Sequence, residues 1–321
     1  MVMRRGRFAP TPSGQLHLGN VLSALLAWLQ MRSQNGAFIL RMEDLDRSRS
    51  RETIARQIAA DLKWLGLDWD EGPDIGGPFG PYVQSKRIER YEEAISQLQS
   101  QHRLYPCFCS RAKLLEIARA PHGLAAEGPV YPGFCKHLTE SEQIRKADEK
   151  KPSLRFAVND QPVYFEDLVL GNQRFAPFAG GDFIVKRADN IHSYQLAVVV
   201  DDAAMGITDV LRGNDLLDST PRQLMLYEAL KLTPPRFGHL PLLYGPDGKR
   251  LSKRHHSIAI HELRAAGVAP EKIIGYLAFW GGQIDRPEPA APCELIDVFD
   301  TRKIPVQNVI LGKETLHQLI V

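Results

Sequence analysis

The amino-acid sequence predicts an α/β fold in which helices cover both faces of a parallel β-sheet, the doubly wound arrangement. Near the N-terminus, a short strand candidate leads through a Pro/Gly turn into an amphipathic helix, and a second strand candidate is followed by a second helix. A similar α/β pattern resumes after residue 182. The chain has 321 residues, 44% of them apolar and 24% charged, which is enough for a substantial core.

The first elements follow from the spacing of apolar residues. Helical spacing after the turn predicts the first helix from Leu18, Val21, Leu22, Leu25, Leu26 and Leu29. Residues 37–42 are expected to form a buried strand, whose polar end carries Glu43, Asp44 and Asp46. A second helix is expected at residues 52–65, closed by Gly66.

The middle of the sequence has a different composition. Residues 101–182 contain the cysteine cluster, many prolines and glycines, and β-like segments at 153–158 and 162–165. We interpret this region as an insertion between two parts of the sheet domain, residues 1–100 and 183–240. The α/β pattern resumes with segments 182–185 and 196–202 and a helix candidate at 221–230. Residues 241–321 are expected to form a lysine-rich loop and a short helical C-terminal part, with a proline-rich linker at 286–292.

Composition also bears on environment and partners. Forty basic and 38 acidic side chains give a formal charge of +2, which neither requires nor excludes a nucleic-acid partner. The longest nearly apolar stretch, residues 21–29, is half of what a membrane span needs, and no apolar run follows the basic N-terminus. We therefore expect a cytoplasmic protein with no membrane partner. We also expect a monomer, although the sequence itself does not decide the oligomeric state.

The turn before the first helix is a candidate phosphate site. In residues 10–20, PTPSGQLHLGN, backbone N–H groups and the positive end of the helix dipole converge on one place. Gly19 lets a ligand approach the backbone, and His17 can donate a hydrogen bond to a phosphoryl oxygen. A capped helix start with a surface histidine explains the same residues without a ligand.

A second cluster lies near the C-terminal part. Residues 248–256, GKRLSKRHH, are a glycine turn followed by the cations Lys249, Arg250, Lys253 and Arg254. Such a loop can close over a triphosphate and neutralise the charge that develops as pyrophosphate leaves. The alternative is a solvated basic loop.

Together these segments resemble the HIGH and KMSKS motifs of class I aminoacyl-tRNA synthetases, as His17-Leu18-Gly19-Asn20 and Arg250-Leu251-Ser252-Lys253-Arg254. The resemblance implies a Rossmann-like catalytic domain that uses Mg-ATP, with catalytic roles for His17 and Lys253. It also implies ATP binding by His17, Gly19, Asn20, Ser252 and Lys253. Asn20 departs from the usual histidine, which leaves the role of that position open.

Segments 7–14, 41–46, 210–215 and 219–223 resemble the glutamyl and glutaminyl branch of that class. Glutamate needs two cations and an anion: Arg7 and Arg212 can each bind a carboxylate, and Glu43 the ammonium. By resemblance, the glutamate site comprises Arg7, Phe8, Ala9, Pro10, Thr11, Glu43, Tyr194 and Arg212. The alternative is that Arg7 and Glu43 form an ion pair at the sheet edge.

The chain after Arg254 is short for a full glutamyl-tRNA synthetase, which continues into a helical anticodon-binding region. The sequence is therefore similar to the truncated paralogues, the glutamyl-Q tRNA(Asp) synthetases. This resemblance implies activation of L-glutamate as glutamyl-adenylate and its transfer to queuosine in the anticodon loop of tRNA(Asp). Three alternatives remain: conventional charging of a tRNA 3′ end, a non-catalytic tRNA-binding paralogue, and a nucleotidyltransferase, which the glutamate-site residues disfavour.

Cys107, Cys109 and Cys135 cluster in the insertion, whereas Cys293 stands apart. In a reducing compartment such clustering favours a metal over a disulfide, and three thiolates with one oxygen or nitrogen complete a structural zinc site. Ligand spacing favours His137 as the fourth ligand, with His122 a weaker candidate. The resemblance implies Tyr131 instead, joining the three cysteines around one zinc. Three free buried thiols are the metal-free alternative.

Overall fold

The computed structural model describes residues 3–110, 131–178, 180–248, 251 and 259–320. Its centre is a parallel four-stranded sheet in the order β2-β1-β8-β9. The strands are β1 (Arg5–Phe8), β2 (Ala37–Leu40), β8 (Asp209–Gly213) and β9 (Arg236–Leu240). The predicted α/β fold with a parallel sheet is therefore confirmed.

Helices cover both faces of this sheet. Phe38 and Leu40 of β2 enter one core, and Ala37 and Ile39 enter the other, because successive strand side chains point to opposite faces. The first core is completed by α1 (Leu18–Arg32), α2 (Glu52–Trp64), α8 (Ile260–Ala265), α9 (Pro270–Trp280) and α10 (Lys313–Ile320). The second is completed by α3 (Ile88–Ser100), α6 (Tyr194–Ala204) and α7 (Thr220–Ala229). Burial on both faces explains why β2 is apolar throughout.

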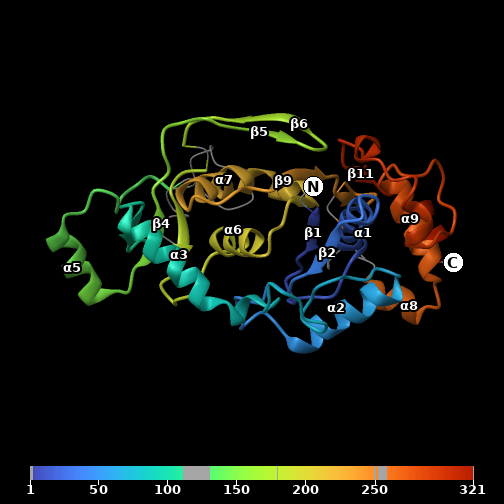
Figure 1. Cartoon of the computed structure of the whole chain (residues 1–321), viewed down its shortest axis with the longest axis horizontal. Coiled ribbons are helices and arrows are strands. Elements are labelled where there is room, and N and C mark those ends of the chain that lie inside the picture. The colour runs from blue at the N-terminus through green and yellow to red at the C-terminus, as the bar shows by residue number, and fades with distance from the viewer. Residues whose placement is uncertain (1–2, 111–130, 179, 249–250, 252–258, 321) are drawn as a thin grey trace.

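In the described residues, the inserted region and the strand that follows it form two small antiparallel sheets. One has the order β3-β4-β7, from β3 (Leu104–Cys107), β4 (Ser153–Phe156) and β7 (Phe183–Lys186); the other is the hairpin β5 (Val163–Asp167) and β6 (Gly171–Phe175). Helix α5 (Glu140–Glu149) lies at the end of the molecule opposite the C-terminal helices, and the hairpin runs along α7 and β9 (Figure 1). β7 lies where the α/β pattern resumes in the sequence, but it pairs with β4 rather than with the parallel sheet.

Residues 196–202, in the second segment where the pattern resumes, lie within helix α6 and are buried. A continuous apolar run has the same composition in a buried helix as in a buried strand. The helix begins after Ser193, whose hydroxyl accepts a 3.3 Å hydrogen bond from the backbone N–H of Leu196. This start places Tyr194 beside the carboxyl ends of the parallel strands.

The C-terminal part packs back on the parallel-sheet domain. β10 (Leu243–Tyr244) pairs in parallel with β11 (Val309–Ile310). The proline-rich segment 286–291 lies against α9, where the carbonyl oxygen of Glu288 is 1.9 Å from the position that a Cβ on Gly275 would take. The described residues also include short 3-10 helices, at η1 (Gln84–Lys86), η2 (Asn214–Ser219), η3 (Pro292–Leu295) and η4 (Thr301–Lys303). Among the described residues, no helix combines the length and apolarity needed to cross a membrane.

Candidate active site

A cavity of about 580 Å³ lies at the carboxyl ends of β1 and β8 and the start of α1. It is lined by all of the predicted glutamate-site residues and by the predicted ATP-site residues of the first motif: Arg7, Phe8, Ala9, Pro10, Thr11, Glu43, Tyr194, Arg212, His17, Gly19 and Asn20. Leu251 also lines it. The remaining predicted residues, Ser252 and Lys253, lie outside the described residues, as do Lys249, Arg250 and Arg254.

The start of α1 forms one wall of this cavity. His17 is the N-cap residue and has an extended backbone, with φ −118° and ψ 164°. Asn20 Oδ1 accepts a 3.3 Å hydrogen bond from the backbone N–H of His17, so the asparagine in the fourth motif position holds the first turn. Outside the adjoining turn of α1 itself, no described protein atom lies within 4 Å of where a Cβ on Gly19 would stand, which leaves that side of the turn open to the cavity.

Behind the cavity lies a network of buried charges. Arg7 Nε donates to Asp202 Oδ1 at 3.3 Å. Arg41 donates to Asp202 Oδ1 at 2.6 Å and to Glu43 Oε1 at 3.0 Å. Arg7 and Glu43 thus each pair with another residue, and in the described structure they form no ion pair with each other, so the sheet-edge alternative is wrong. The hydrogen bonds of Arg7 use Nε, which leaves its terminal nitrogens for a ligand.

Burial and neighbouring charges set the protonation of this network. Burial tends to raise the pKa of Asp202, but Arg7 and Arg41 outweigh it, so the pKa lies below its usual value. Burial raises the pKa of Glu43, against the opposing effect of Arg41 and Arg7. Burial also raises the pKa of Tyr194, which keeps its phenol a hydrogen-bond donor.

The side chains that accept hydrogen bonds from Arg212 are neutral. Its guanidinium donates to His239 Nε2 at 3.1 Å, to Gln223 Oε1 at 2.8 Å and to Thr220 Oγ1 at 2.8 Å. It lies 4.9 Å from the ring centroid of Phe237 and is 4% exposed. Burial, with the charge of Arg7, lowers its pKa. Within the described part of the chain it has no ion pair, so a buried cation at the cavity wall lacks an anion.

Several residues of this site were missed by the sequence reasoning. Asp202 and Arg41 hold the charges behind the cavity, and His239, Thr220 and Gln223 hold Arg212. A signal for Asp202 was present, since Asp201 and Asp202 are two adjacent acids in an otherwise apolar run. Both are buried, and such a pair requires cationic partners.

The cysteine cluster forms a second candidate site. Ligand atoms of Cys107, Cys109 and Cys135 lie within 4.8 Å of one another. Tyr131 Oη lies 3.6 Å from Cys107 Sγ and 3.8 Å from Cys109 Sγ, and it accepts a 2.8 Å hydrogen bond from the backbone N–H of Cys135. His137 is exposed and is not part of the cluster. His122 lies outside the described residues, and Cys293 is exposed.

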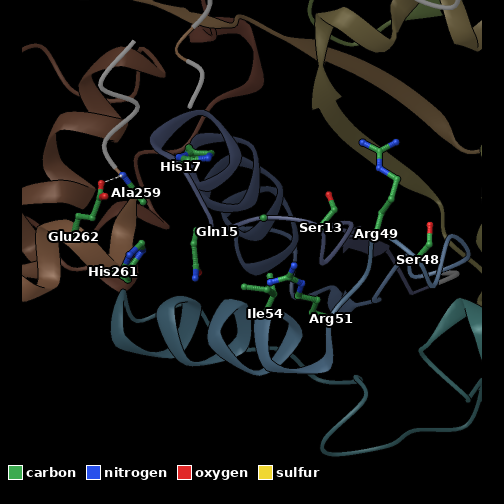
Figure 2. A pocket seen from close by; sticks show the side chains of 11 residues that line it. Ser13, Gln15, His17, Ser48, Arg49, Arg51, Ile54, Ala259, His261 and Glu262 are labelled. Carbon is green, nitrogen blue, oxygen red and sulfur yellow. Dashed lines mark hydrogen bonds between the residues drawn. The ribbon is translucent and has the colours of Figure 1, made fainter. Parts of the chain in front are cut away.

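A further cavity of about 610 Å³ adjoins the first and shares Ser13, Gly14, Gln15 and His17 with it. Figure 2 shows its other residues, which come from the segment before α2, from α2 and from the start of α8: Ser48, Arg49, Arg51, Ile54, Ala259, His261 and Glu262. Glu262 accepts a 3.1 Å hydrogen bond from the backbone N–H of Ala259 (Figure 2). His17 therefore stands between the main cavity and a second cavity that Arg49 and Arg51 make basic.

The fold and the site together define the class of protein. Residues 3–316 match the model of the family described as tRNA synthetases class I (E and Q), catalytic domain. The chain therefore belongs to this family and is a ligase of the class I synthetase type.

Similar proteins of known name indicate the branch of this family that the chain resembles. The chain is 61% identical to the Glutamyl-Q tRNA(Asp) synthetase of Symbiobacterium thermophilum, over 98% of both chains. It is 47% identical to the enzyme of that name from Nitratidesulfovibrio vulgaris, over 99% of this chain and 98% of the other. The resemblance to these truncated paralogues is confirmed. The crystal structure of a glutamate tRNA ligase from Elizabethkingia meningosepticum matches with a TM-score of 0.85 at 29% identity, covering 99% of this chain and 69% of that one.

Proposed function

We propose that this protein activates L-glutamate with Mg-ATP as glutamyl-adenylate and transfers the glutamyl group to queuosine in the anticodon loop of tRNA(Asp). The observation that carries this proposal is the cavity itself, in which two arginines and a glutamate surround one space beside a helix start. Relatives that carry the glutamyl-Q name match the chain over nearly their full length, which supports the same acceptor. We expect the reaction in the cytoplasm, by a monomer.

The glutamate site follows from complementary charge. Arg212, with no described anionic partner, binds one carboxylate, and the terminal nitrogens of Arg7 bind the other. Glu43 accepts hydrogen bonds from the ammonium group, and Tyr194 donates a hydrogen bond from its phenol. Phe8, Ala9, Pro10 and Thr11 form the backbone wall between these groups.

Activation takes place at the start of α1. A carboxylate oxygen of glutamate attacks the α-phosphorus of ATP, and pyrophosphate leaves with the electron pair of the broken P–O bond. His17 donates a hydrogen bond to the phosphoryl oxygens, beside Gly19 and Asn20. The resemblance to the KMSKS motif assigns Ser252 and Lys253 to the triphosphate, where the ammonium of Lys253 neutralises the leaving charge. Mg²⁺ accompanies ATP and supplies further positive charge at the phosphates.

Transfer uses the adenylate as the electrophile. A hydroxyl of the queuosine ring attacks the carbonyl carbon, its proton is lost, and AMP leaves with the C–O bonding electrons. Proteins read RNA specifically at loops with unstacked bases, which suits an anticodon loop bound at the active site itself.

We also propose one structural zinc in the insertion, held by Cys107, Cys109, Cys135 and Tyr131. Three clustered thiols are the donor set that zinc prefers, and the phenol oxygen lies among them. When bound, the zinc ties the start of the insertion, at β3, to the segment at 131–135. Because the cluster has four donors, it offers a closed site rather than a catalytic one.

The first test is glutamate-dependent exchange of pyrophosphate into ATP. We expect exchange with glutamate and none with glutamine, whose amide leaves an arginine partly unpaired at a cost of roughly 2–4 kcal/mol. Lys253→Ala should slow the exchange about 10²–10³-fold. Equal exchange with both amino acids would refute the glutamate site, and no exchange would favour a non-catalytic paralogue.

The second test identifies the acceptor. An isolated anticodon stem-loop carrying queuosine should accept labelled glutamate, and the same RNA without the modification should not. Relatives named glutamate–tRNA ligase, such as one from Syntrophus aciditrophicus at 42% identity, make conventional charging the competing function. That function would be supported if only intact tRNA were labelled and periodate oxidation of its 3′ end abolished labelling.

A further inference from the structure

Three buried side chains from separate parts of the chain meet behind the cavity. Arg212 on β8 and His239 on β9 are direct partners across the parallel ladder. Asp167 ends β5, so it is contributed by the inserted hairpin. Their exposed fractions are 4%, 0% and 3% respectively. Asp167 and His239 do not line the cavity, whereas Arg212 does.

The hydrogen bonds fix the tautomer of His239. Arg212 Nε–H can only donate, so His239 Nε2, at 3.1 Å, must accept and carry no proton. The proton is then on Nδ1, which donates to Asp167 Oδ2. Thr220 Oγ1 accepts from Arg212 at 2.8 Å and lies 3.1 Å from His239 Nε2, where its own hydroxyl can donate.

Asp167 is itself held rigidly. Its Oδ1 accepts from the backbone N–H groups of Val169 at 3.0 Å, Leu170 at 2.9 Å and His239 at 3.1 Å. Only Oδ2 is therefore directed at the imidazole. This arrangement holds the guanidinium of Arg212 in one orientation while leaving its positive charge uncompensated, because the group that touches it is a neutral imidazole.

We propose that Asp167 and His239 are positioning residues, which orient Arg212 for a substrate carboxylate by fixing the imidazole as the Nδ1–H tautomer. This inference rests on the proposed function of the cavity. It also gives the inserted hairpin a part in amino-acid binding, since Asp167 reaches the site through His239 alone.

Asp167→Asn tests the inference with a change of one atom. The three backbone N–H donors keep the amide oxygen at the Oδ1 position, so the new NH₂ group faces His239 Nδ1. Nδ1 must then accept, the proton moves to Nε2, and an N–H faces the N–H of Arg212. We expect the KM for glutamate to rise about 10- to 100-fold, the scale for a lost hydrogen bond to a charged group, with the KM for ATP within about twofold.

The control variants separate this effect from general damage. His239→Gln supplies a carbonyl oxygen near the Nε2 position and has no tautomers, so in that background Asp167→Asn should change the KM for glutamate little. The side chain of His239→Asn is too short to place an acceptor at the Nε2 position, so this variant should raise the KM even with Asp167 intact. It provides the test should Asp167→Asn fail to fold. Asp160→Asn, at an exposed position of the insertion, is the matched carboxylate-to-amide control.

A second measurement does not depend on activity. Nitrogen-15 spectra of histidine-labelled protein report the tautomer, with the His239 signals assigned by their loss in His239→Gln. The wild type should show the Nδ1–H form and Asp167→Asn the Nε2–H form. An unchanged tautomer, or an unchanged KM for glutamate in folded Asp167→Asn, would overturn the inference. Absence of glutamate-dependent exchange in the wild type would instead refute the proposed function, while the tautomer switch would still be observed.

Discussion

Asp202 lies between the guanidinium groups of Arg7 and Arg41, and the three side chains are at most 5% exposed. Its carboxylate compensates two cations that would otherwise be buried together. Arg7 can therefore present its terminal nitrogens to a ligand while Nε remains fixed. Arg212 differs, because its neutral partners orient it without compensating its charge.

Asp202→Asn should destabilise the fold by about 3–5 kcal/mol, because it leaves Arg7 and Arg41 without their shared anion. Urea unfolding at neutral pH measures this loss. Glu52→Gln, which removes an exposed pair with Arg56, is the control and should have little effect. A loss no larger than that of the control would show that the network contributes no net stability.

The same variant has a defined pH dependence. The pKa of Asp202 is lowered from 3.8 in the folded state, so its stabilising contribution is present above pH 3.8 and is lost as the pH falls through the lower folded value. The stability difference between the wild type and Asp202→Asn should therefore shrink in strong acid. A constant difference across that range would contradict the lowered pKa.

The positions of several helices and strands could be predicted from the local spacing of apolar residues, because local interactions determine them. Apolar spacing identified α1, α2 and α7, and the strands β2, β4 and β5 lie within or overlap the predicted segments. The partners of Asp202 and the contact between Asp167 and His239 depend on segments far apart in the sequence, and no spacing rule reports them. The pairing of β7 with β4 could not be predicted for the same reason, because the sequence of an apolar strand does not show whether the strand pairs in parallel or antiparallel.

The cysteine cluster joins two parts of the insertion, the end of β3 and the segment at 131–135. Tyr131→Phe should weaken zinc retention more than His137→Ala, because Tyr131 Oη lies among the thiols and His137 is exposed. Release of zinc to a competing chromogenic chelator measures the order. Faster release from His137→Ala would assign the fourth ligand to the histidine, and metal-free wild-type protein would favour free thiols.

The second cavity, beside His17, places two further arginines next to the main cavity. Arg49 and Arg51 line this second cavity, and both are exposed. An RNA bound at the main cavity passes close to them if its backbone follows the shared wall.

Changing Arg49 and Arg51 together to Gln should therefore weaken transfer of glutamate to RNA and reduce its dependence on salt, because two phosphate contacts are lost. The negative slope of log transfer efficiency against log salt concentration should become shallower by about 0.7 for each lost contact with single-stranded RNA. An unchanged slope would place the RNA elsewhere. Arg302→Gln, on an exposed arginine of η4, is the matched control.

The parallel sheet also sets an order of events during synthesis. β1 pairs with β2 on one side, about 30 residues later, but its other partner is β8, where Arg5 meets Thr208 across a separation of 203 residues. A ribosome adding about 5–20 residues per second needs roughly 10–40 s to cover that distance. Throughout this interval one edge of β1 has no strand to pair with, and the arginine that it carries at position 7 has not yet met Asp202. The N-terminal strand can therefore complete its pairing in the sheet only after β8 has been synthesised.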